Sequence, residues 1–385
     1  MYQNNTVKRI NNIIIIAIFT VINIFSPVTA VADSPVIIAE CAILAEVTSG
    51  RVLFSQNADV KRYPASTTKI MTAIVILENC DISDIVTVPK EAQGVEGSSI
   101  YLEAGEKLTV LQLLYGLMLR SGNDAATALA IHCAGSVHNF AQMMNQKAQT
   151  IGCENTNFVN PSGLPSPQHY TTAYDLMLIA RYAMHIDIFK KIVSSQKILI
   201  PWNGHEYDRI LINENKMLYN YDGANGIKTG YTKAAGRCLV SSAERDGMTL
   251  IAIVLNSSPM YAECSKLLDY GFDNHKLTKI VTENEFCGNI PVNGGFKKSI
   301  PYSNSLGFCY PLSPNDSVSV QTELYSSSVD APFEQGIPVG SITIILNGNI
   351  IKNIPLETLG GMKKNTFFER FKTLLYLLCN NQLFQ

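Results

Sequence analysis

The chain has 385 residues, a formal net charge of −2, and 16% charged against 46% apolar residues. The charged fraction is below the roughly 25% of an average soluble domain, and the apolar fraction is too high for a disordered chain. A near-neutral balance without a basic run excludes a typical nucleic-acid binder. The length favours two domains, or three.

The nine cysteines include no Cys-x-x-Cys pair, which excludes the common zinc-finger and thioredoxin-like motifs. Their odd number leaves at least one cysteine unpaired or paired between chains. Because their spacings suggest no disulfide framework, we expect most of them to be buried free thiols. The sequence predicts no metal and no cofactor.

The N-terminal segment has the features of a secretory signal peptide. Lys8 and Arg9 precede the apolar run 13–25, and Ala30-Val31-Ala32 fits a small-x-small cleavage site. The alternative is a transmembrane anchor, but the run is shorter than the ~20 residues that span a bilayer. We therefore predict a signal peptide at 1–32 and an exported mature chain.

The elements expected in chain order alternate between strands and helices. Two strands are expected within 36–53, and helices at 70–77, 109–119, 125–134 and 172–184. Strands follow at 226–230, 237–243 and 248–255, the last two joined by an Asp246-Gly247 hairpin, and then a helix at 261–272. This order predicts an α+β domain with an antiparallel sheet over 33–273. Short alternating segments predict a small all-β domain over 274–359.

The last segment, 360–385, predicts an amphipathic helix with basic flanks. Its apolar residues recur at helical spacing, and its basic residues lie before or between them: Phe367, Phe368, Phe371, Leu374, Leu375 and Leu378, with Lys363, Lys364, Arg370 and Lys372. One interpretation is a final helix packed on a core. We favour a helix that lies in the outer surface of the cytoplasmic membrane.

The first motif that predicts chemistry is Ser66-Thr67-Thr68-Lys69, at the start of the buried helix. Residues i and i+3 share a helix face, so the lysine amine can take the proton that a serine must lose to become a nucleophile. A second copy, Ser194 to Lys197, leads into a strand-like run with no turn to expose a nucleophile. We reject that copy.

Two further motifs follow in order. Ser121 and Asn123 lie between two predicted helices and offer a hydroxyl for proton relay and an amide for a substrate carbonyl; a similar triplet, Ser313-Pro314-Asn315, lies in the β-rich segment. Lys228-Thr229-Gly230 lies on a predicted strand and is expected by chance in about one chain in ten. Its lysine and threonine can hold a carboxylate, and its glycine lets a substrate backbone approach.

Together these motifs resemble those of serine-type D-Ala-D-Ala carboxypeptidases, the low-molecular-mass penicillin-binding proteins. The resemblance extends to the segments 62–73, 160–164 and 169–173 and covers essentially the whole mature chain. It implies a β-lactamase/transpeptidase-like domain, with helices on both sides of an antiparallel sheet, followed by a small β-rich domain. It also implies attachment at the outer face of the membrane.

The resemblance implies a role for each motif residue. Ser66 would attack the carbonyl of the penultimate D-Ala of a peptidoglycan stem peptide, with Lys69 as general base and Ser121 as proton relay. The substrate would be held by residues of the second and third motifs, including a backbone oxyanion hole made by Ser66 and Tyr231: Asn123, Lys228, Thr229, Gly230 and Tyr231. β-Lactams would acylate Ser66 as covalent inhibitors.

One feature departs from the family pattern, and one histidine needs a separate interpretation. Some relatives bind the substrate carboxylate with an arginine beyond the strand that follows Lys-Thr-Gly, but the stretch from Asn256 to Tyr261 contains none. His169 lies in a family segment, and we interpret it as a hydrogen-bonded structural residue.

Two rival functions remain. A β-lactamase of related fold needs a glutamate to activate the deacylating water, and Glu154 is the candidate by spacing, although the segment after it resembles carboxypeptidases. The other rival is a non-catalytic penicillin-binding scaffold, a protein class that can lose its proton-transfer residues; here all are present.

Overall fold

The computed structural model describes residues 34–379, which form two compact units. Within the described residues, the first unit contains 34–277 with 311–313, and the second contains 278–310 and 314–379. The predicted signal peptide, 1–32, lies outside the described residues.

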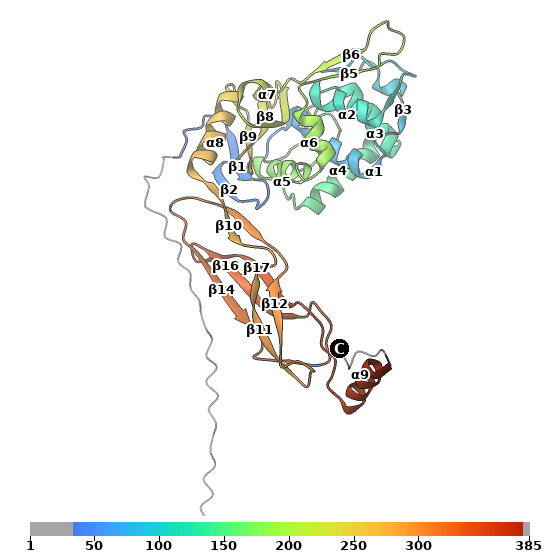
Figure 1. Cartoon of the computed structure of the whole chain (residues 1–385). Coiled ribbons are helices and arrows are strands. Elements are labelled where there is room, and N and C mark those ends of the chain that lie inside the picture. The colour runs from blue at the N-terminus through green and yellow to red at the C-terminus, as the bar shows by residue number, and fades with distance from the viewer. Residues whose placement is uncertain (1–33, 380–385) are drawn as a thin grey trace, which may run out of the picture. The chain divides into compact units, whose positions relative to one another are not determined.

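A five-stranded antiparallel sheet forms the centre of the first unit, in the order β2-β1-β9-β8-β7 (Figure 1). Its strands are β1 (Cys41–Glu46), β2 (Val52–Gln56), β7 (Ala224–Thr232), β8 (Gly236–Arg245) and β9 (Met248–Leu255). Asp246 and Gly247 join β8 to β9 at φ 50° and 75°, which is the backbone of a type I′ turn. The predicted hairpin is confirmed.

Both faces of this sheet are buried. In β1, Ile43 packs into the larger core with the helices α1 to α6, whereas its neighbour Leu44 packs on the opposite face with α8. In β9, Ile253 and Val254 divide in the same way. Because successive side chains of a strand point to opposite faces, such unbroken apolar runs need cover on both sides. The predicted fold class, with helices on both sides of the sheet, is confirmed.

The larger group of helices covers one face, and α8 covers the other (Figure 1). The helices of this unit are α1 (Lys69–Asn79), α2 (Val110–Leu119), α3 (Asn123–Ala134), α4 (Val137–Ile151), α5 (Ala173–Ala183), α6 (Asp187–Ser194), α7 (Met217–Asn220) and α8 (Met260–Asn274). Two short hairpins complete it: β3 (Ile85–Thr87) with β4 (Lys107–Thr109), and β5 (Lys197–Ile200) with β6 (Arg209–Ile212).

The sequence analysis did not predict α4 and α6, although both carry local signals. The side chain of Ser136 caps α4 by accepting a hydrogen bond from the backbone N–H of Asn139 (3.1 Å). In α6, Phe189, Ile192 and Val193 are buried at the i, i+3, i+4 spacing of an amphipathic helix. Both helices pack against α1 and complete the larger hydrophobic core.

The second unit is a β-rich module, as predicted. Its main sheet has the order β14-β16-β17-β12-β11-β15, and β10 pairs separately with β13. The strands are β10 (Lys276–Val281), β11 (Phe286–Asn293), β12 (Ser299–Asn304), β13 (Phe308–Leu312), β14 (Val318–Leu324), β15 (Val329–Asp330), β16 (Pro338–Leu346) and β17 (Asn349–Thr358). In β16, Ile342, Ile344 and Leu346 are buried at period two, which is the pattern of a sheet with one covered face.

A final helix, α9 (Phe367–Cys379), follows the module. Five of its aromatic and aliphatic side chains are exposed: Phe367 78%, Phe368 80%, Phe371 51%, Leu375 44% and Tyr376 66%. Within residues 34–379, no helix is both long enough and apolar enough to cross a bilayer. The interpretation of α9 as a helix packed on a core does not fit these exposed side chains.

Candidate active site

The first motif lies where a 3₁₀ turn, η1 (Ala65–Thr68), passes directly into α1. The hydroxyl of Thr67 donates to the carbonyl of Pro64 (2.7 Å), and Ala65 has a positive φ of 50°. A non-glycine residue at positive φ stores backbone strain, which is often found at functional sites. Ser66 itself is half-buried, on the side of this turn that the solvent reaches.

Lys69 joins three separate segments of the chain. Its Nζ lies 3.0 Å from Ser66 Oγ, 2.7 Å from Asn123 Oδ1 and 2.7 Å from the carbonyl oxygen of Ser162. The side chain is fully buried. The structure therefore brings the first and second motifs into direct contact, across a sequence separation that no local pattern reveals.

The two buried lysines of the site have lowered pKa values. Burial, followed by the positive charge of Lys228, holds the pKa of Lys69 well below its usual range, while Asp124 and Glu214 act in the opposite direction. Burial also lowers the pKa of Lys228 to about 8, against the opposing effect of Glu214. Burial thus makes the neutral form of the Lys69 amine easier to reach than it is in water.

The second motif forms a tight connection between α2 and α3. Ser121 adopts φ 59°, and its buried Oγ has no hydrogen-bond partner among the described residues. Asn123 uses both ends of its amide, because Oδ1 accepts from Lys69 and Nδ2 donates to the carbonyl of Glu96 (2.6 Å). The next carboxylate, Asp124, accepts from the backbone N–H groups of Ile100 and Leu102 (both 3.0 Å) and fixes the facing loop.

The third motif lies on β7, the edge strand of the sheet. Lys228 is buried, and its Nζ donates to the carbonyl of Thr229 (3.2 Å). A Cβ placed on Gly230 would lie 3.1 Å from both the carbonyl oxygen of Pro64 and the backbone nitrogen of Ser66. The backbone that approaches this glycine is thus the nucleophile segment itself, whereas the sequence argument assigned the space to a substrate.

The loop at 160–163 is a part of the site to which the sequence analysis gave no role. The carbonyl of Ser162 accepts from Lys69, and the carbonyl of Pro161 accepts from the hydroxyl of Thr72 (2.6 Å). A Cβ on Gly163, which has φ +89°, would lie 1.8 Å from the carbonyl oxygen of Ala65. Only glycine fits between this loop and the turn that carries the nucleophile.

His169 fits the interpretation as a structural residue. Its Nδ1 accepts from the backbone N–H of Val159 (3.1 Å), so Nε2 carries the proton and donates to the hydroxyl of Thr68 (2.8 Å). Burial, with a contribution from the charge of Lys69, lowers the pKa of this imidazole to about 4. A neutral ring that bonds on both sides positions the turn next to Lys69 and leaves no lone pair for a substrate.

Two other candidates lie elsewhere. Glu154 is exposed beyond the end of α4, and the backbone N–H of its neighbour Asn155 is held by the carboxylate of Asp175 (2.7 Å). After β9, where some relatives carry an arginine, the side chain of Asn256 donates to Glu40 (2.9 Å). Within the described residues, no group of three His, Cys, Asp or Glu residues is arranged to hold a metal ion. Eight of the nine cysteines, from Cys41 to Cys309, are free thiols.

Comparisons with known proteins agree with this geometry. Residues 28–259 match the D-alanyl-D-alanine carboxypeptidase family, and residues 275–364 match the C-terminal domain of penicillin-binding protein 5. The chain is 32% identical to the carboxypeptidase DacF of Bacillus subtilis over 87% of this chain and 88% of that protein. It is also 32% identical to DacA of Escherichia coli over 91% of this chain and 90% of that protein.

Solved structures give the same result. Penicillin-binding protein 5 from Haemophilus influenzae superimposes with a TM-score of 0.74 at 29% identity, covering 86% of this chain and all of that one. A variant of the Streptomyces K15 DD-transpeptidase has a TM-score of 0.60 at 36% identity, covering 62% of this chain and all of that one. The fold and the motifs define a penicillin-binding serine peptidase. The chain belongs to the D-alanyl-D-alanine carboxypeptidase family.

Proposed function

We propose that this chain is a serine-type D-alanyl-D-alanine carboxypeptidase that removes the terminal D-Ala from peptidoglycan stem peptides through an acyl-enzyme on Ser66. The observation that supports it best is the set of three contacts around Lys69 Nζ, to Ser66, Asn123 and the Ser162 carbonyl. A neutral amine has two N–H donors and one lone pair. Two of the three neighbours can only accept, so the lone pair is left for the hydroxyl of Ser66.

In the proposed acylation step, Ser66 Oγ attacks the carbonyl carbon of the penultimate D-Ala while its proton passes to Lys69 Nζ. The backbone N–H groups of Ser66 and Tyr231 stabilise the oxyanion. Breakage of the C–N bond then releases the terminal D-Ala, whose amine takes the proton back through the hydroxyl of Ser121. Ser121 Oγ has no hydrogen-bond partner among residues 34–379, which leaves it available for this relay.

The other motif residues would hold the substrate. Asn123 is fixed by Glu96 and contributes its amide to the substrate, and Thr229 contacts the terminal carboxylate, with the charge of Lys228 behind it. Gly230 keeps the strand close to the nucleophile. Water hydrolyses the acyl-enzyme and regenerates Ser66. A β-lactam, which mimics D-Ala-D-Ala, would acylate the same oxygen and leave slowly.

The first test is the substitution Ser66→Ala in the purified protein. We expect it to abolish both D-Ala release from a stem pentapeptide and covalent labelling by a fluorescent penicillin, because Ser66 carries the only hydroxyl bonded to Lys69 Nζ within the described part of the chain. Labelling that survives the substitution would refute this assignment of the nucleophile. Rapid β-lactam turnover by the unaltered protein would favour the lactamase alternative, and labelling without any D-Ala release would favour the scaffold.

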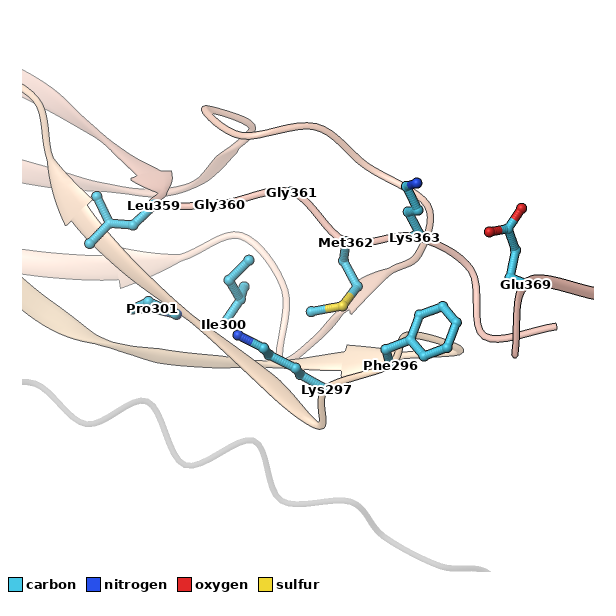
Figure 2. A pocket seen from close by; sticks show the side chains of 10 residues that line it. All are labelled: Phe296, Lys297, Ile300, Pro301, Leu359, Gly360, Gly361, Met362, Lys363 and Glu369. Atoms are coloured by element: carbon cyan, nitrogen blue, oxygen red, sulfur yellow. The ribbon is translucent and has the colours of Figure 1, made fainter. Parts of the chain in front are cut away.

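We also propose that the mature protein works outside the cytoplasm, attached to the membrane surface. Three features support this: the signal-like segment 1–32, the basic residues around α9, and the exposed apolar side chains of that helix. A cavity of about 460 Å³ lies next to the start of α9, and Figure 2 shows the side chains that line it. Phe296 and Met362 line it, and the two lysines Lys297 and Lys363, against the single carboxylate of Glu369, leave a net positive charge that suits anionic headgroups.

Truncation after Gly361 tests this attachment. We expect the shortened protein to stay in solution when mixed with anionic vesicles while the full mature chain pellets with them, and both to release D-Ala at similar rates. A truncated protein that still pellets would contradict the assignment of the attachment to α9.

A further inference from the structure

Another cavity, of about 440 Å³, lies in the first unit. It lies beyond the nucleophile turn and has no role in the proposed chemistry. Tyr63, which lines it, comes directly before Pro64, whose carbonyl lies against Gly230. Ala234 and Ala235, which also line it, follow β7 in the turn to β8. The cavity therefore adjoins the end of β7 that lies past the Lys-Thr-Gly motif. We call it the Lys61 pocket.

The charges in the Lys61 pocket do not cancel. Glu40 is engaged by two neighbours, because Arg62 pairs with one of its carboxylate oxygens and the amide of Asn256 donates to the other (2.9 Å). Lys61 is exposed, and its Nζ lies 4.6 Å from the centre of the Tyr170 ring. Within residues 34–379 it forms no ion pair with a carboxylate. The ammonium group of Lys61, next to the Tyr170 ring, is therefore available to bind an anionic group of a ligand.

The direction of the substrate follows from the roles proposed above. The departing D-Ala takes a proton from Ser121 and holds its carboxylate at Thr229, so the leaving group lies toward the start of the Lys-Thr-Gly segment. The acyl half must then leave the carbonyl carbon in the opposite direction, past Tyr231 toward Ala234. From Thr229 to the end of β7 at Thr232 the strand advances three residues, about 10 Å at about 3.3 Å per residue, and an extended peptide covers this length in about three residues.

We propose that the Lys61 pocket is a subsite for a carboxylate on the acyl half of the substrate, about two to three residues before the scissile bond. The ligand class is thus an acidic peptide that ends in D-Ala-D-Ala. Lys61 supplies the charge-assisted contact, Arg62 adds a second cation already balanced by Glu40, and the rings of Tyr63 and Tyr170 cover the aliphatic part of the acidic residue. This inference rests on the proposed function.

The test compares two pentapeptides that differ in one group: the second residue carries either a free carboxylate or the corresponding amide. We expect the unaltered full-length mature enzyme to prefer the carboxylate peptide by about tenfold in kcat/KM, the size of one charge-assisted hydrogen bond. Lys61→Gln should remove most of that preference through a higher KM at unchanged kcat. Acylation by a penicillin with a short side chain, which does not reach the pocket, should stay at the rate of the unaltered enzyme.

Lys233→Gln is the matched control, since Lys233 is also exposed, in the adjoining turn, but does not line the pocket. It should keep the preference. Equal rates on both peptides for the unaltered enzyme, or equal losses in the two lysine variants, would overturn the subsite. D-Ala release from neither peptide would instead count against the proposed function, so the two failures are distinguishable.

Discussion

The chain contains two Ser-x-x-Lys segments, and the structure gives them opposite settings. Ser66 lies in the turn that opens α1, and Lys69 is the first residue of that helix and fully buried. Ser194 is the last residue of α6, and Lys197 is an exposed residue at the start of β5. In the second segment the serine hydroxyl donates to the carbonyl of Lys191 (3.3 Å). The same four-residue pattern makes a coupled pair only where a buried helix start holds both residues.

The sharpest test of this contrast replaces the two lysines in parallel. Lys69→Gln should lower the rate of penicillin acylation by about a thousandfold, because the base that accepts the Ser66 proton is lost. Lys197→Gln should leave the rate unchanged. Stopped-flow acylation measures both, and near-ultraviolet circular dichroism checks that the variants keep their tertiary packing. A comparable loss in the Lys197 variant would show that the effect is not specific to the buried pair.

The sequence was enough to propose which side chains carry the chemistry, because the residue types and their order along the chain can be read directly from it. It was not enough to predict the other groups that surround Ser66 and Lys69. The third neighbour of Lys69 is the backbone carbonyl of Ser162, an atom that every residue has. Asp124 and Glu214 act on Lys69 from other segments of the chain. Such neighbours follow from the way loops fold back, and no spacing rule reports them.

The five-stranded sheet shows the same difference between what local sequence patterns predict and what they do not. The strands β8 and β9 and the turn between them were predictable because apolar runs and an Asp-Gly turn are local signals. The need for Gly230 was also predictable, but its partner was not, because the contact with Pro64 joins segments far apart in the chain. Local patterns therefore predict elements, and the structure is needed to show which of them meet at the nucleophile.

A smaller effect is expected from the loop that supports the first pair. Gly163→Ala should destabilise the protein by about 3 kcal/mol, because the added Cβ would meet the carbonyl of Ala65 at 1.8 Å in addition to the cost of a positive φ. Gly152→Ala is the matched control, since Gly152 also has a positive φ (+98°) but open space around it. It should cost only about 1 kcal/mol.

Chemical denaturation measures both glycine variants, and penicillin acylation gives a second readout. The Gly163 variant should also lose acylation, because its loop holds Lys69, whereas the Gly152 variant should acylate at the normal rate. Equal destabilisation of the two variants would mean that the backbone angle alone, and not the contact with the nucleophile turn, requires glycine at 163.

The smallest expected effect concerns the pH dependence of kcat/KM. This dependence reflects the charge states of the two buried lysines, Lys69 and Lys228. Lys69 must be neutral to accept a proton, so kcat/KM should rise with pH through its lowered pKa. Lys228 must be charged to favour the substrate carboxylate, so kcat/KM should fall as pH rises through about 8. The profile is then bell-shaped, with its alkaline limb set by Lys228.

Lys228→Arg separates these contributions, because a guanidinium stays protonated throughout the accessible range. The variant loses absolute rate, since a planar fork replaces a buried ammonium, but its alkaline limb should move up by about one unit or more while the acid limb keeps its direction. An alkaline limb that stays near pH 8 in the variant would assign that titration to another group. The positive charge of Lys228 would then not set the pH dependence. The different roles of Lys228 and Lys69 would have to follow from their positions in the site alone.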